Sequence, residues 1–93
     1  MTPNNYEIVL TPSAKKAIAE ALPEPVAIAV IEFLSSSLIV NPHRIGKPLR
    51  DDLKGIWSAR RGTYRVLYRI FEEQREVLVL RIEHRRDAYR PLA

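Results

Sequence analysis

The amino-acid sequence predicts a small α+β domain in which an N-terminal strand and a helical hairpin pack on an antiparallel sheet. Three observations lead to this fold class. The 93 residues are too few for two hydrophobic cores, so we expect a single domain over residues 1–93. Apolar residues recur at helical spacing in the first half, and the second half changes to an alternating pattern. The resulting order is strand, helix, helix, strand, strand, strand, which is typical of α+β proteins.

The first half of the chain predicts one strand and two helices. Residues 6–10 are short, β-branched and partly alternating, as in a strand. Thr11 and Pro12 are residue types preferred at a helix N-cap and first helical position, so a helix is expected over residues 13–21. A more apolar helix is expected from residue 25 to about residue 38, ending at Asn41-Pro42, because a residue before proline disfavours helix. His43 is then expected in a loop.

The second half predicts three strands joined by short polar turns, over residues 56–61, 64–71 and 77–83. Such connections require antiparallel neighbours, because a parallel pair needs a long crossover. The middle strand has two faces. The face expected to pack under the helices carries Tyr64, Val66, Tyr68 and Ile70. The face expected to stay open carries Arg65, Leu67, Arg69 and Phe71.

Composition excludes several classes of protein. There is no cysteine, which excludes disulfides, cysteine–metal sites and thiol chemistry, and fits a reducing cytosol. No run of about 18 apolar residues occurs, and residues 1–6 lack a charged-then-apolar signal pattern. We therefore expect a cytoplasmic protein that does not contact a membrane.

The positive charge is concentrated in the second half of the chain. The net charge is +4, but the first 43 residues hold two lysines against four glutamates, whereas the remainder holds 13 basic residues against seven acidic ones. All 11 arginines lie between Arg44 and Arg90. Because the planar guanidinium suits bidentate phosphate contacts, this stretch predicts a phosphate or nucleic-acid surface. The alternative is a solvated face with scattered ion pairs.

Five short motifs stand out in this stretch: residues 46–50 (GKPLR), 53–55 (LKG), 57–62 (WSARRG), 64–68 (YRVLY) and 84–90 (HRRDAYR). Together they resemble the RelE/ParE toxin superfamily, and most closely the RelE-type members of actinobacterial toxin–antitoxin systems. The resemblance spans almost the whole chain in element order. The fourth and fifth motifs are specific in combination, and either alone is weak.

The resemblance implies the toxin component of a type II toxin–antitoxin system, acting as a ribosome-dependent mRNA endonuclease. Toxins of this type cut mRNA in the ribosomal A site without a metal or other cofactor, by activating the 2′-hydroxyl to attack the adjacent phosphate. Such chemistry needs a proton acceptor, a stabiliser of the charge on phosphorus and a proton donor for the leaving oxygen. The implied partners are the ribosome, mRNA and a cognate acidic, RelB-like antitoxin in a hetero-oligomer.

Four residues are candidates for catalysis. Arg65 matches the family arginine that contacts the scissile phosphate. Tyr89 matches the terminal tyrosine that stacks on a base or moves a proton, although it equally suits anchoring of the C-terminal tail. Arg85 is one of two matches, with Arg86, to a second catalytic arginine. His84 is a candidate because histidine is a common general acid or base, but strict strand alternation puts it with Leu78, Leu80 and Ile82, where a packed strand end is the commoner role.

The further candidates contact RNA or phosphate. They are Arg60, Arg61, Arg69, Arg86, Lys47, Arg50 and Lys54. Arg61 is expected to face away from Arg60 or into the turn. Lys47, Arg50 and Lys54 either contact ribosomal RNA or simply face water.

One departure from the family pattern concerns the proton acceptor. The best-studied RelE enzymes carry lysines on the strand before the YRVLY motif, where this chain has Ile56 and Ser58. The acceptor then has to be His84, Glu83 or Asp87.

Three alternative functions stay open: an attenuated toxin that acts by binding, a ParE-like inhibitor of DNA gyrase, and a basic interaction domain without activity.

Overall fold

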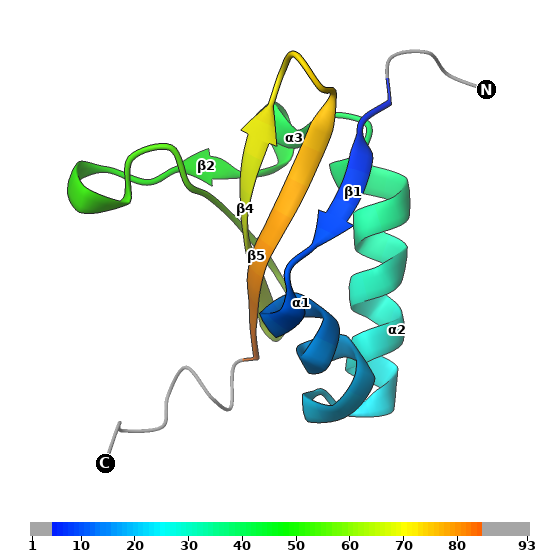
Figure 1. The fold of residues 1–93 in the computed structure, drawn as a ribbon. Helices are drawn as coiled ribbons and strands as arrows, with labels where there is room; N and C mark the ends of the chain where they lie inside the picture. The colour runs from blue at the N-terminus through cyan, green and yellow to red at the C-terminus, as the bar shows by residue number, and fades with distance from the viewer. Residues whose placement is uncertain (1–4, 85–93) are drawn as a thin grey trace.

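The computed structural model describes residues 5–84, which form one sheet covered on one face by helices (Figure 1). The elements in chain order are β1 (Glu7–Leu10), α1 (Pro12–Lys16), η1 (Ala17–Ala21), α2 (Glu24–Phe33), η2 (Leu34–Leu38), α3 (Pro42–Ile45), β2 (Lys47–Pro48), η3 (Asp51–Leu53), β3 (Trp57–Arg61), β4 (Tyr64–Phe71) and β5 (Glu76–His84). α1 and α2 each continue into a wider π-helical turn, η1 and η2. The two predicted helices and four predicted strands are all present.

The segment between the helical hairpin and β3 is more structured than the sequence predicts. Pro42 begins α3 as well as following the end of the previous helix, because its fixed φ suits the first helical position. His43 therefore lies in a one-turn helix, and its expected place in a loop is wrong. β2 and η3 follow before β3 and were not predicted, since two or three residues carry no periodic pattern.

The sheet has five strands in the order β1-β5-β4-β3-β2. β3, β4 and β5 are antiparallel neighbours, as predicted, and the unpredicted β2 is antiparallel to β3, but β1 runs parallel to β5. The sheet is thus mixed and not wholly antiparallel. The helical hairpin provides the long connection after β1 that a parallel arrangement requires.

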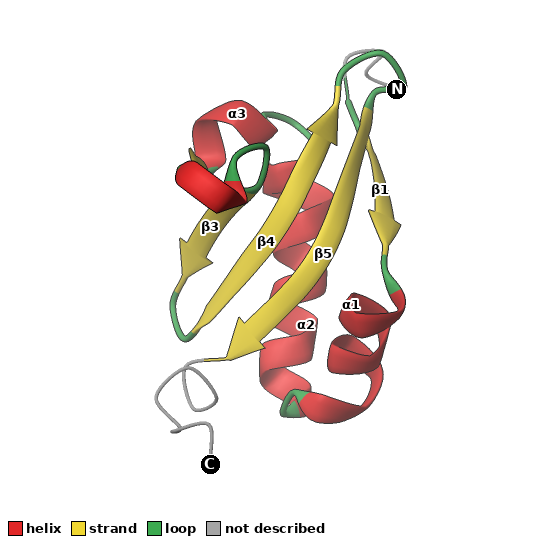
Figure 2. Ribbon diagram, turned by 60° about the vertical axis from the view of Figure 1, so that its left-hand side comes forward, coloured by secondary structure: helices red, strands yellow, loops and turns green. Residues whose placement is uncertain are grey.

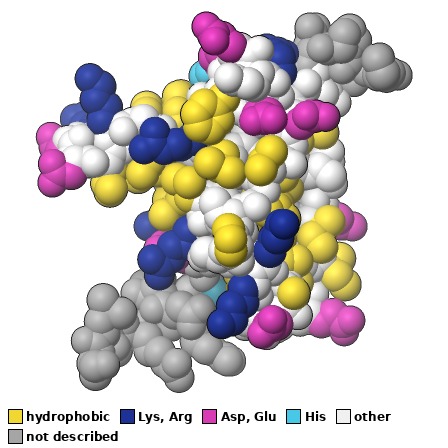
Figure 3. Space-filling view, viewed as in Figure 1, with side chains coloured by type: hydrophobic (Ala, Val, Ile, Leu, Met, Phe, Trp, Pro, Cys, Tyr) yellow, Lys and Arg dark blue, Asp and Glu magenta, His cyan; other side chains and the backbone are white. Residues whose placement is uncertain are grey.

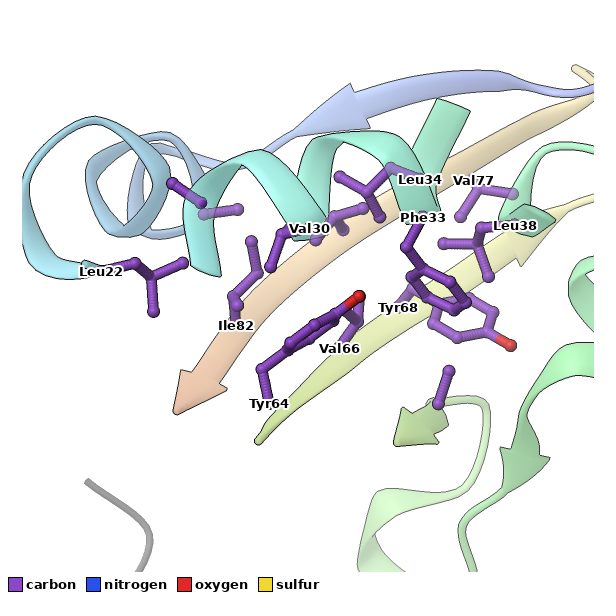
Figure 4. Packing of buried hydrophobic residues seen from close by; sticks show 14 of the residues in the cluster. Leu22, Val30, Phe33, Leu34, Leu38, Tyr64, Val66, Tyr68, Val77 and Ile82 are labelled. Atoms are coloured by element: carbon purple, nitrogen blue, oxygen red, sulfur yellow. The ribbon is translucent and has the colours of Figure 1, made fainter. Parts of the chain in front are cut away.

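The core lies between α2 and one face of the sheet (Figures 2 and 4). The buried helical side chains include Val30, Phe33, Leu34 and Leu38, and those of the sheet include Tyr64, Val66, Tyr68, Val77, Val79 and Ile82. The predicted two faces of β4 are confirmed, because Tyr64, Val66 and Tyr68 are buried while Arg69 and Phe71 are exposed. We call the uncovered side, which faces the viewer in Figure 2, the open face of the sheet.

A β-bulge in β5 changes which residues reach each face. Leu67 pairs with Arg81 but the next residue, Tyr68, pairs with Val79, so Leu80 is an extra residue on β5. The Thr11 hydroxyl donates a hydrogen bond to the Leu80 carbonyl oxygen at 2.7 Å. The Thr11 N–H donates to the Val79 carbonyl oxygen at 3.1 Å. Thr11 also caps α1, since its Oγ1 accepts from the Ala14 N–H.

Because of the bulge, the side chains of β5 do not alternate strictly between the two faces, as the sequence had predicted they would. Val79 and Ile82 are both buried although they are three residues apart. Leu78 pairs with Arg69 on the open face, so the expectation that it shares a side with Ile82 is wrong. His84 does share the side of Ile82, because it pairs with the buried Tyr64.

Tyr68 fixes the start of β2 against the sheet. Its hydroxyl donates to the Pro42 carbonyl oxygen at 2.6 Å, and its ring stacks on Trp57 with centroids 6.5 Å apart. Burial raises the pKa of Tyr68 to about 12. A Cβ on Gly46 would collide with the Tyr68 hydroxyl and lie 2.9 Å from the Ser58 carbonyl oxygen. Glycine at this position therefore permits the close approach of β2 to the sheet.

Candidate functional site

Three charged residues form a row across the open face. In the β3–β4 register Arg60 pairs with Arg65, and in the β4–β5 register Arg65 pairs with Glu83. Directly paired residues share a face, and Arg65 alternates with the buried Tyr64 and Val66. The row therefore lies away from the helices, as the sequence predicted for Arg65.

Glu83 lies between two arginines. Its Oε1 is 3.8 Å from an Arg65 Nη, and its Oε2 is 3.5 Å from the Arg81 Nε. The Glu83 side chain is 25% exposed, whereas those of Arg65 and Arg81 are 43% and 65% exposed. Pairs this exposed contribute only about 0–1 kcal/mol, so a phosphate can compete for either guanidinium. Within residues 5–84, Arg60 takes part in no ion pair with a carboxylate.

Further cations adjoin this row. A second row of paired residues lies beside the first. It runs across the strands from Lys47 through Ser58 and Leu67 to Arg81. Lys47 on β2 thus lies in the same row as Ser58. Arg69 lies further along β4, next to Gly55, whose added Cβ would be 3.4 Å from an Arg69 Nη. We define the arginine face as Lys47, Arg60, Arg65, Arg69, Arg81 and Glu83.

Arg81 was not among the predicted site residues. Strict alternation groups it with Val77 and Val79, which the structure buries against the helices. The bulge at Leu80 reverses that assignment for every later residue of β5. A signal was nevertheless present in the sequence. Ile82 is the apolar residue most suited to the core near the strand end, and its neighbours Arg81 and Glu83 must then face the other way.

The structure separates several predicted site residues from the arginine face. Arg61 lies on the helix side, with its guanidinium carbon 5.0 Å from the centroid of the Phe33 ring. There it borders a groove between α2 and the β3–β4 turn, which Val26, Ala29 and Tyr64 also line. Arg61 is therefore a cation–π partner that faces away from Arg60, as expected.

Arg50 and Lys54 flank η3, exposed in the connection between β2 and β3.

His84 is on the other side of the sheet from Arg65. It pairs with Tyr64, which packs on Phe33 with ring centroids 6.1 Å apart. Its side chain is half-buried. The prediction that His84 takes part in catalysis therefore gains no support from its position. Arg85, Arg86, Asp87 and Tyr89, the other candidates at the end of the chain, lie outside the described residues.

The other end of the open face holds exposed apolar side chains together with two glutamates. Val9 and Phe71 are 39% and 38% exposed there, and Glu7 and Glu76 lie in the same row as Phe71. Val9 pairs with Leu78, which pairs with Arg69, so the apolar surface directly adjoins the cations. In Figure 3 hydrophobic side chains gather in the middle of the molecule, with Asp and Glu above them and Lys and Arg beside and below them. Exposed apolar side chains of this kind beside charged ones are typical of a protein-binding surface.

A second polar cluster lies at the β4–β5 turn and stabilises the fold. The Tyr6 hydroxyl donates to the Glu72 Oε1 at 2.9 Å and accepts from an Arg75 Nη at 3.2 Å, and His43 pairs with the same Glu72. Burial, followed by the hydrogen bond to Glu72, raises the pKa of Tyr6. The cluster joins β1, α3 and the turn before β5. No group of three or more metal-ligating side chains occurs among the residues the structure describes.

A match to a known protein family shows the family to which this chain belongs. Residues 8–89 match the family described as the ParE toxin of the type II toxin–antitoxin system parDE. The chain belongs to the RelE/ParE family of type II toxins. The resemblance inferred from the motifs is thus confirmed.

The chain is similar in sequence to two RelE-type toxins of Mycobacterium tuberculosis. It is 47% identical to toxin RelG over 85 residues, which cover 91% of this chain and 97% of RelG. It is 45% identical to toxin RelE over 85 residues, covering 91% of this chain and 87% of that protein. A solved structure, the RelBE2 toxin–antitoxin complex of M. tuberculosis, matches with a TM-score of 0.84 and 46% identity, covering 87% of this chain and 99% of the matched chain. No helix within residues 5–84 is long and apolar enough to span a bilayer.

Proposed function

We propose that this toxin is a ribosome-dependent endonuclease that cuts mRNA in the A site by attack of the RNA 2′-hydroxyl on the adjacent phosphate. The observation that carries the proposal is the row Arg60–Arg65–Glu83, which puts two guanidinium groups and one carboxylate side by side on an uncovered surface. The reaction adds negative charge to a phosphate, and preorganised cations stabilise such charge in the transition state. The toxin acts in the cytoplasm, where its substrate is.

In this mechanism Arg65 binds the scissile phosphate. It is central in the row, and its pairing with Glu83 at 3.8 Å holds the guanidinium near the sheet without occupying all its donors. Arg60 and Arg81 contact the flanking phosphates of the mRNA. Lys47, with Arg50 and Lys54 in the loop around η3, contacts ribosomal RNA, where backbone contacts supply affinity without sequence preference.

The test is cleavage on programmed ribosomes. Purified toxin is added to ribosomes that hold a defined mRNA codon in an empty A site, and the new mRNA ends are mapped. We expect one cut within the A-site codon, and none in the same mRNA without ribosomes. A 2′-deoxy nucleotide at the cut site should prevent cleavage. Cutting of free mRNA, or of the deoxy substrate, would refute the proposed chemistry.

Arg65→Ala is the decisive variant for the site. We expect it to abolish growth arrest and to slow cleavage by at least about 10²-fold, which is the effect of losing one preorganised charge-stabilising donor. Antitoxin binding should stay nearly unchanged. The matched control is Arg44→Ala, which removes an exposed arginine of α3. An Arg65→Ala toxin that still halts translation would remove Arg65 from the mechanism.

We also propose that an acidic, RelB-like antitoxin covers the open face. The similar RelBE2 toxin was solved as a toxin–antitoxin complex. Here the cations adjoin the apolar surface around Val9 and Phe71, which suits a segment with acidic and apolar side chains. Phe71→Asp should weaken antitoxin binding measured by titration calorimetry, and a Kd equal to that of the wild type would contradict this placement.

The runner-up is inhibition of DNA gyrase. The description of the matching family names the ParE toxin, which favours this candidate. Arg65 on an open face argues against it, because inhibition by binding requires no phosphate-directed arginine. A supercoiling assay with purified gyrase separates the two functions: inhibition at toxin concentrations that leave mRNA intact on ribosomes would favour the runner-up. A toxin that binds ribosomes without cutting would be the attenuated form.

A further inference from the structure

We propose that Glu83 is the proton acceptor of this site, and that the β-bulge at Leu80, held by Thr11, is what brings it there. The inference rests on the proposed endonuclease function and names the residue that replaces the lysines missing at Ile56 and Ser58. Three features of the described residues support it: the position of the carboxylate, the register of β5 and the contacts of Thr11.

The position of Glu83 suits proton transfer at a phosphate that Arg65 binds. Its Oε1 is 3.8 Å from the Arg65 Nη, so a ribose bound next to that phosphate lies within reach of the carboxylate. The other described glutamates in the paired rows of this face, Glu7 and Glu76, pair at the end that carries Phe71. That end is six residues along β4 from Arg65, about 20 Å at roughly 3.3 Å per residue.

The register explains why the acceptor is Glu83 and not His84. Without the extra residue Leu80, alternation from the buried Val79 would turn His84 to the open face and Glu83 to the helices. With it, Glu83 pairs with Arg65 and His84 with the buried Tyr64. Bulges commonly re-aim side chains beside active sites in this way.

Thr11 holds the bulge from the far side of β5. Its hydroxyl donates to the Leu80 carbonyl oxygen at 2.7 Å and its N–H donates to the Val79 carbonyl oxygen at 3.1 Å. A bulge leaves a backbone group without its ladder partner, and an alternative partner stabilises that arrangement. Thr11 is therefore a positioning residue that acts on Glu83 through the backbone of β5.

The step is a transesterification. The Glu83 carboxylate takes the proton as the 2′-O–H bond breaks, and the 2′-oxygen forms a bond to phosphorus while the bond from phosphorus to the 5′-oxygen breaks. The leaving 5′-oxygen takes a proton from water. The products are a 2′,3′-cyclic phosphate and a 5′-hydroxyl, and Glu83 returns its proton to solvent. No oxidant, reductant or metal enters the balance.

The first test compares Glu83→Gln with Glu76→Gln, a glutamate on the same strand and face but at its other end. Single-turnover cleavage of the A-site codon should slow by about 10²- to 10⁴-fold in Glu83→Gln, the usual contribution of a general base. Glu76→Gln should cleave at the wild-type rate. A Glu83→Gln rate within about threefold of wild type, far less than that contribution, overturns the proposal.

The second test separates proton transfer from a merely structural role. Formate should restore cleavage to Glu83→Ala in proportion to its concentration, because the side chain is partly exposed and its removal leaves room for a small carboxylate. Glu83→Asp should retain more activity than Glu83→Gln. The proposal would fail if formate did not restore cleavage to Glu83→Ala and if Glu83→Asp and Glu83→Gln cleaved at equal rates. Glu83 would then only position the arginines.

The third test addresses the bulge. Thr11→Ser keeps the hydroxyl and should keep wild-type cleavage, whereas the near-isosteric Thr11→Val removes the bond to Leu80 and should slow cleavage while the thermal midpoint shows a folded protein. Folded Thr11→Val with the wild-type rate would remove Thr11 from the mechanism.

Failure of the inference is distinct from failure of the proposed function. If wild-type toxin cleaves the 2′-deoxy codon or does not cleave on ribosomes at all, the function fails. If it cleaves normally but Glu83→Gln does so too, only the role of Glu83 fails.

Discussion

Removal of the Tyr68 hydroxyl tests how much its hydrogen bond to Pro42, at the start of α3, contributes to stability. In Tyr68→Phe the ring stays fully buried and stacked on Trp57, but the Pro42 carbonyl oxygen loses a donor at 2.6 Å. Leaving a buried acceptor unsatisfied costs about 1–3 kcal/mol. An unfolding entropy of about 2.1 cal/mol/K per residue corresponds to roughly 0.2 kcal/mol/K for this chain, so the melting midpoint should fall by about 5–15 °C.

The same variant has a distinctive pH dependence. Burial raises the pKa of Tyr68 to about 12 from 10.0, so the unfolded chain loses this proton first as the pH rises. The contribution of Tyr68 to stability is therefore complete below pH 10 and declines as the pH rises toward 12, by up to about 3 kcal/mol. Tyr68→Phe lacks this loss, so the stability difference between the two proteins should shrink in alkali.

The assay is urea unfolding of wild type and Tyr68→Phe at a series of pH values from neutral to alkaline. Tyr6→Phe is the matched control, because its hydroxyl donates to Glu72, which is 53% exposed and can bond to water instead. We expect that control to cost about 1 kcal/mol or less. Equal stabilities of Tyr68→Phe and wild type at neutral pH, or a difference that does not change with pH, would refute the reasoning.

Two further variants test other contacts. Gly46→Ala should destabilise the protein by about 1–3 kcal/mol in the same unfolding assay, because the new methyl group meets the buried Tyr68 hydroxyl and the Ser58 backbone; Gly46→Ala as stable as wild type would show that β2 is not packed so closely. His84→Gln should reduce cleavage on ribosomes by less than about tenfold, because His84 faces the helices and general acid–base groups contribute about 10²–10⁴. A larger loss would restore His84 as a catalytic candidate.

The larger elements follow from the sequence because each carries a periodic pattern. β4 alternates strictly from Tyr64 to Phe71, and its buried and exposed residues are the ones the pattern predicts. The expected helix from residue 25 to about residue 38 corresponds to α2 with η2. Their buried residues recur at helical spacing and are Ala27, Val30, Phe33, Leu34 and Leu38. Arg65 on the open face is a direct consequence of the same alternation.

The features that could not be predicted from the sequence are those that produce no periodic pattern of apolar residues. β2 has two residues, and its position depends on the missing side chain of Gly46 and on the hydrogen bond that Tyr68 donates to Pro42 of α3, 26 positions earlier. The parallel pairing of β1 with β5 depends on the path of the helices. The bulge at Leu80 is hydrogen-bonded to Thr11, 69 positions earlier, so local alternation within β5 does not reveal it.

The pairing of the first strand with the last also bears on how the chain folds during synthesis. Thr11 bonds to Leu80 across 69 positions, and β1 gains its neighbour only when β5 exists. Contacts so distant in sequence close slowly, because a long loop has to be ordered before they form. The ribosome therefore has to synthesise β5 before the open face of the sheet can assemble. A delay of this kind separates the making of the toxin from its action, and it leaves an interval in which a partner can capture the nascent product.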